Sequence, residues 1–133
     1  MSAIIEKMKK IDKLYHVQGC SFKQLKEAQN ELGITFPDEY MDIVKEYGAI
    51  SFFGTEWTGL NVDSYLNVVE VTKNERNLND TFPKDCFVLE NQGIDGLIVI
   101  CNEKGQVFSL QYDKIKKIHE SISSYLDECI ARK

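Results

Sequence analysis

Apolar residues recur at helical spacing along the first third of the chain. Ile4, Met8, Ile11 and Tyr15 form a stripe that predicts a helix over residues 3–15. Lysines crowd the other face of this segment, where they could touch a membrane or a nucleic acid. We favour a solvated face, because no aromatic residues interleave with these lysines.

A second helix is predicted after the break at Gly19 and Cys20. Ser21 and Gln24 stand at the positions of a capping box, in which each side chain bonds to the backbone N–H of the other residue. The expected buried stripe of this helix consists of Phe22, Leu25, Ala28 and Leu32.

The segment from Leu32 to Gly48 carries a consistent set of local signals. Gly33 suits a left-handed cap at the end of the second helix. Pro37 suits the first turn of a third helix, because its missing N–H would have no partner there. The acidic residues Asp38 and Glu39 follow, where negative charge complements the helix dipole. A helix is therefore predicted over residues 37–47, with Tyr40, Ile43, Val44 and Tyr47 on its buried face.

Strand-like patterns begin after Gly48. Two short strands are predicted over residues 50–53 and 56–61, followed by a short helix over residues 68–77. Three more strands are predicted over residues 86–90, 96–101 and 107–112, and a last helix over residues 121–131. This order predicts one α+β domain, spanning residues 1–133, in which an antiparallel sheet of about five to six strands follows N-terminal helices and a C-terminal helix packs on the sheet.

The run LGITFPDEYMDIVKEYG, residues 32–48, resembles the signature of the SUKH superfamily, the Smi/Knr-like domain. That signature is a helix ending in Leu-Gly, then Phe-Pro-x-x-Tyr opening the next helix, then a Gly leading into a sheet. The resemblance continues at Gly59-Leu60 and at Val107–Asp113, so it covers nearly the whole chain. It implies the SUKH fold. Bacterial members are mostly immunity proteins that neutralise secreted polymorphic toxins, and fungal members regulate cell-wall synthesis.

The net charge of the protein restricts which class of partner it can bind. The 133 residues carry a formal net charge of −5, and acidic proteins are poor ligands for a nucleic-acid backbone, which selects clustered Lys and Arg. A basic protein is a compatible partner, although mild acidity also aids solubility. The first residues do not form a secretory signal, and no apolar run reaches the length of a membrane span. We therefore expect a cytoplasmic protein.

The sequence offers few groups for catalysis or metal binding. The four cysteines, Cys20, Cys86, Cys101 and Cys129, fit no zinc-binding spacing, and we interpret them as small buried apolar residues. The two glycines of residues 91–96 join two strands and form neither a P-loop nor a dinucleotide-binding loop. We predict no metal, no cofactor, no disulfide and no enzymatic activity.

The predicted partner-binding residues surround the first pair of strands. Glu56 and Asp63 would steer a basic partner, and Trp57 and Tyr65 would supply rigid contact area. Trp57 alternates with its neighbours on a strand, so a place in the core is an equally good interpretation. The surface around residues 93–96 and Tyr112 is a second place where a partner could bind.

The functional hypothesis that follows is an immunity protein that binds a cognate basic toxin domain, with nucleases as one candidate class, and acts as a monomer or weak dimer. The alternative is a non-enzymatic regulator or adaptor of the Smi/Knr cell-wall type, although the fungal members usually carry long disordered extensions. An enzyme would need a convergent polar pocket that the sequence does not indicate.

Overall fold

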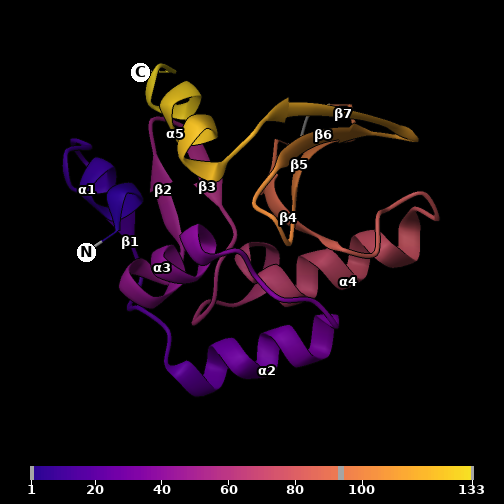
Figure 1. Cartoon of the computed structure of the whole chain (residues 1–133), viewed down its shortest axis with the longest axis horizontal. Helices are drawn as coiled ribbons and strands as arrows, with labels where there is room; N and C mark the ends of the chain where they lie inside the picture. Colours follow the sequence, from indigo (N-terminus) through magenta and orange to yellow (C-terminus); the bar gives the residue numbers. More distant parts are fainter. Residues whose placement is uncertain (1, 93–94, 133) are drawn as a thin grey trace.

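The computed structural model describes residues 2–92 and 95–132, and it shows an α+β fold with two antiparallel sheets (Figure 1). The helical segments are α1 (Ala3–Lys9), α2 (Phe22–Leu32), α3 (Asp38–Tyr47), the 3-10 turn η1 (Ser64–Leu66), α4 (Val68–Leu78) and α5 (Ile122–Ile130). The strands are β1 (Tyr15–His16), β2 (Ile50–Phe52), β3 (Thr55–Trp57), β4 (Cys86–Asn91), β5 (Leu97–Asn102), β6 (Val107–Gln111) and β7 (Lys114–His119).

The strands divide between a three-stranded sheet, β1-β2-β3, and a four-stranded sheet, β4-β5-β6-β7, where the sequence predicted one sheet. The α+β class and the closing C-terminal helix are confirmed. Figure 1 shows the larger sheet strongly curved above α4, with α5 at the top of the view and α2 at the bottom. Helix α4 contacts both β4 and α2, so it joins the larger sheet to the N-terminal helices.

The predicted helix boundaries between Ser21 and Gly48 are confirmed with small changes. Ser21 and Gln24 form the complete capping box, and Gly33 ends α2 in the left-handed conformation with φ 69°. Pro37 is the residue before the first turn of α3 rather than a member of it, with an extended backbone. These boundaries could be predicted because hydrogen bonds between residues close in the sequence determine where a helix begins and ends.

The stripe predicted for the third helix is the centre of the core. Tyr40, Ile43, Val44 and Tyr47 are all buried. The Tyr40 ring lies 4.5 Å from the ring of Phe87 on β4, measured between centroids. Helix α3 therefore packs on the larger sheet, as the sequence predicted.

Three predictions about individual segments are wrong. The first helix ends at Lys9, and the chain turns through Lys13, whose φ of 59° is left-handed, before Tyr15 joins β1. Phe22 is 76% exposed, because the first residue of α2 faces away from the core. The strand predicted over residues 107–112 ends at Gln111, and Tyr112 lies in the turn that follows, with φ 58°.

Strand β7 is an edge strand that the sequence did not predict. It pairs with β6 from Val107↔His119 to Gln111↔Lys114, and most of its side chains are exposed. Its lysines Lys114, Lys116 and Lys117 discourage pairing with a further strand, because charged side chains protect an open sheet edge. Backbone hydrogen bonds to β6, rather than burial of its own side chains, cause this segment to form a strand.

All four cysteines are buried, which confirms their interpretation as small core residues. Burial raises the pKa of Cys86 to about 12 and that of Cys129 to about 11, and it also raises the pKa of Cys20 and Cys101. The thiol form therefore persists well above neutral pH in the native protein.

We predict that Tyr40→Ala lowers the free energy of unfolding by about 3 kcal/mol, because it leaves a cavity between α3 and β4. Tyr40→Phe should cost about 1 to 2 kcal/mol, since it removes the hydroxyl that lies within hydrogen-bond distance of the Thr58 carbonyl (3.0 Å) and of the Thr58 hydroxyl (3.2 Å). Urea denaturation measures both values. Tyr15→Ala on the exposed β1 is the control, and an unchanged midpoint for Tyr40→Ala would contradict the packing described here.

We also predict that the native protein reacts slowly with a thiol reagent at pH 8, because the thiolate is the reactive form and each thiol is buried. Cys20, the least buried of the four at 8% exposure, should react first. After denaturation without reductant, all four thiols in the sequence should titrate. Fewer than four would indicate a disulfide in the isolated protein.

Candidate functional site

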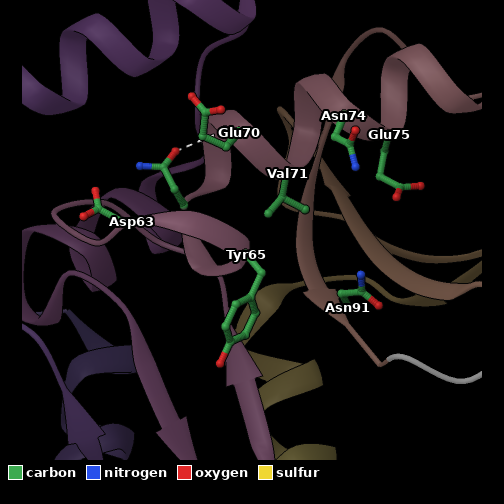
Figure 2. Close-up of a pocket in the computed structure, with 8 residues that line it drawn as sticks. Asp63, Tyr65, Glu70, Val71, Asn74, Glu75 and Asn91 are labelled. Atoms are coloured by element: carbon green, nitrogen blue, oxygen red, sulfur yellow. Dashed lines mark hydrogen bonds between the residues drawn. The ribbon is translucent and has the colours of Figure 1, made fainter.

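A surface hollow of about 590 Å³ lies between η1, α4 and the end of β4. We call it the acidic hollow. It is lined by Asp63, Tyr65, Asn67, Glu70, Val71, Asn74, Glu75 and Asn91. Figure 2 shows Asp63 and Tyr65 on one side and Asn74 and Glu75 on the other, with Val71 between them.

Asn67 fixes the corner from which the hollow is built. Its side-chain carbonyl accepts hydrogen bonds from the backbone N–H groups of Val69 (3.0 Å) and Glu70 (3.1 Å), which caps α4. Its amide nitrogen donates to the carbonyl of Val62 at 3.0 Å. The turn that carries Tyr65 is thereby held against the first turn of α4.

The lining is acidic. The eight lining residues include the carboxylates of Asp63, Glu70 and Glu75 and no lysine or arginine. Burial raises the pKa of Glu75 above its ordinary value, because removal from water disfavours the charged form. A cation placed beside Glu75 would lower that pKa again, so binding of a positive group and ionisation of Glu75 favour each other.

The structure brings three of the four sequence-predicted residues together. Asp63 and Tyr65 line the acidic hollow, and the Tyr65 hydroxyl donates to Glu56 Oε2 at 3.4 Å. The Tyr65 side chain is 65% exposed, so its ring is available to a partner. Glu56 points outward from β3 and is exposed.

The assignment of Trp57 to a partner surface is wrong, because Trp57 is completely buried. Strand β3 alternates, so Thr55 and Trp57 face the core while Glu56 between them faces solvent. The indole stacks on the ring of Tyr125 at 5.8 Å between centroids, with an interplanar angle of 8°. Trp57 therefore belongs to the contact between β3 and α5.

Sequence reasoning missed the contribution of α4 and β4 to this site. Glu70 and Asn74, like Val71 and Glu75, are four residues apart, so the predicted helix could have placed them on neighbouring positions of one face. No sequence pattern indicates Asn91, because it lines the hollow only as a result of the packing of β4 against α4. The central residues of the predicted second surface, Gly93 and Ile94, lie outside the described residues.

A buried polar cluster joins β4 to the end of α5. Glu90, which is only 4% exposed, accepts a hydrogen bond from the Tyr125 hydroxyl and another from Arg132 Nη1 at 2.9 Å. Arg132 also donates to Thr55 Oγ1 at 2.9 Å. Burial and the neighbouring Glu90 carboxylate raise the pKa of Tyr125. Both charged groups of the cluster, Glu90 and Arg132, are paired. Such pairing is typical of a cluster that stabilises the fold rather than of a reactive site.

Ser124, His119 and Glu128 form a chain of hydrogen bonds like that of a hydrolase triad. His119 Nδ1 lies 2.8 Å from Ser124 Oγ, and Nε2 lies 2.7 Å from Glu128 Oε1. A triad also needs free donors for an oxyanion and a place for substrate.

The backbone donors next to Ser124 already have acceptors. The nearby backbone N–H groups of Ile122 and Ser123 donate to Glu39 Oε1 at 3.0 and 3.3 Å, and that of Ser124 donates to Ser121 Oγ at 3.0 Å. None of the triad-like residues lines the acidic hollow. The described residues also contain no group of three His, Cys, Asp or Glu side chains placed to hold a metal ion.

Comparison with known proteins identifies the family. A family model described as SMI1-KNR4 cell-wall, of the SUKH group, matches residues 1–131. A search of curated proteins gave no match. No helix in the described ranges combines the length and apolar character needed to cross a bilayer. The match covers almost the whole chain and agrees with the motif at residues 32–48, so the chain belongs to the SUKH (SMI1-KNR4) family.

Proposed function

We propose that this chain is an immunity protein that binds a cognate secreted toxin and neutralises it by protein–protein contact. Membership of the SUKH family supports an immunity or Smi/Knr-type role. The observation that carries the proposal is the acidic hollow, which is lined by three carboxylates and an exposed tyrosine ring, without a lysine or arginine among the lining residues. In this proposal the protein acts in the cytoplasm and has no catalytic activity.

The chemistry of the hollow selects a basic partner. Negative charge gathered in a concave surface raises the local concentration of a positively charged protein and accelerates encounter. Toxins that cleave nucleic acids need basic clefts to bind phosphate groups, so a nuclease domain is one class that fits. An acidic protein that covers such a cleft would exclude the nucleic acid.

Glu56, Asp63 and Tyr65 have distinct roles in this proposal. Glu56 and Asp63 steer the approach of the partner. Tyr65 is the anchor, because an aromatic ring buries a large area at a small cost in conformational entropy. The hydrogen bond from Tyr65 to Glu56 holds the ring at the rim of the hollow before the partner arrives.

A regulator or adaptor of the cell-wall type is the second candidate function, since the description of the matched family includes the cell wall. The two candidates differ in partner. An immunity protein protects cells against the toxin encoded beside its own gene, and an adaptor would bind a protein of the cell-wall system. Co-expression with the neighbouring toxin domain decides between them, because only an immunity protein restores growth.

Binding kinetics with the purified toxin domain should distinguish the residues that accelerate association from the residue that slows dissociation. Glu56→Lys or Asp63→Lys should slow association by roughly tenfold at low salt, with an effect that fades as salt rises. Tyr65→Ala should speed dissociation by roughly thirtyfold, the equivalent of about 2 kcal/mol. Surface plasmon resonance at two salt concentrations measures both rates.

Two variants serve as controls for these kinetics. Tyr65→Phe keeps the ring and loses the bond to Glu56, so it should retain most of the affinity. Asp113→Lys makes the same change of charge in the turn between β6 and β7 and should change association much less. If folded Glu56, Asp63 and Tyr65 variants all bound the toxin domain like the parent, this face would not be the binding surface.

A further inference from the structure

Two more hollows adjoin the acidic hollow. One, of about 230 Å³, lies between α2 and α4. Its α2 side is formed by Glu27, Ala28 and Glu31, and it shares Asn67 and Glu70 with the acidic hollow. Asn67 and Glu70 therefore stand at the border between the two hollows.

The other hollow, of about 310 Å³, lies beyond the opposite border of the acidic hollow. It is lined by Glu56, Glu90, Gln92 and Arg132, among others, and it shares Asn91 with the acidic hollow. The hydrogen bond from Tyr65 to Glu56 crosses the same border. The three hollows thus lie next to one another in the order α2, α4, end of β4, and we call this series of hollows the long groove.

The long groove holds negative charge that the protein does not neutralise. Glu56, Asp63, Glu70 and Glu75 form no ion pair with any residue in the described ranges. The single arginine of the lining, Arg132, is occupied by Glu90.

On α2 the carboxylates do have partners. Glu27 lies 4.0 Å from Lys23, and Glu31 lies 3.0 Å from Lys73. These pairs are exposed and therefore weak, so a partner cation can replace either lysine at little cost.

We infer that the long groove holds an extended segment of a partner protein, rich in lysine and arginine. A single inserted side chain would fill one hollow, whereas an extended chain can pass over three neighbouring hollows, each of which is lined by acidic groups. The exposed Tyr65 ring can stack on a guanidinium, and the Asn74 amide can donate to and accept from a passing peptide backbone. The inference rests on the proposed function only for the identity of the partner.

An eight-residue lysine peptide tests the groove without knowledge of the toxin. Titration into the isotopically labelled full-length chain should shift the backbone amide signals of Ala28, Val71 and Gly54, one in each hollow. A peptide of eight glutamates should leave them unchanged. The affinity for the lysine peptide should fall as salt rises, and a two-residue lysine peptide should bind much more weakly because it spans one hollow.

Matched variants distinguish the groove from general attraction to an acidic protein. Glu27→Gln and Glu75→Gln lie in different hollows, and each should weaken peptide binding about threefold, with nearly additive effects when combined. Glu46→Gln on α3 and Asp113→Asn in the β6–β7 turn remove the same charge outside the groove. Each of these outside variants should change the affinity for the lysine peptide by less than half as much as a groove variant does.

Signal shifts confined to one hollow, or equal losses for the groove variants and the outside variants, would overturn the inference. Either result would leave the proposed immunity function standing if Tyr65→Ala still impaired toxin binding. Conversely, peptide binding along all three hollows with no protection against the neighbouring toxin would support the groove and contradict the immunity function. The two proposals therefore fail in different experiments.

Discussion

Thr58 joins the two sheets and the central helix at one buried point. Its backbone N–H donates to the Leu89 carbonyl at 2.8 Å, and its hydroxyl donates to the Val88 carbonyl at 2.7 Å. Its own carbonyl accepts the hydroxyl of Tyr40 at 3.0 Å. Next to this bond, the Val88 N–H donates to the hydroxyl of Thr72 on α4 at 3.0 Å. Every group here is buried, so loss of one partner leaves a desolvated polar atom that costs about 1–3 kcal/mol.

The candidate site depends on this junction because its walls come from both sides of it. Strand β3 leads through Thr58 to Gly59, where an added Cβ would lie 1.8 Å from the carbonyl oxygen of Gly48. That close approach lets Leu60 N–H bond to Gly48 at 3.1 Å and Gly59 N–H bond to Leu66 at 2.8 Å. The turn carrying Tyr65 is therefore placed by glycine backbone contacts, and α4 is placed by Thr72. The hollow between them is preformed rather than assembled by a partner.

The sequence predicted those features that local bonding decides. The cap at Gly33, the capping box at Ser21 and the stripe of α3 depend on neighbours within one or two turns. The shortened first helix and strand β7 could not be predicted this way, because pairing of Tyr15 with Ser51 and of Lys114 with Gln111 decides them. The same limit applies to function. Asp63 and Tyr65 are neighbours in the chain, but only tertiary packing brings Asn91 to them.

The positions of the charged groups explain how the fold can be stable although carboxylates of the long groove have no ion-pair partners. Where a carboxylate is deeply buried, as at Glu90, Arg132 and Tyr125 satisfy it, so the ion pair serves the fold. Where carboxylates stay near solvent, as at Asp63 and Glu70, water lowers the cost of leaving them without a cation. Glu75 lies between these cases, since its pKa is raised by burial without a compensating partner. In the proposed complex, a cation supplied by the partner would relieve that cost, so the burial of Glu75 would contribute to the affinity for a basic partner.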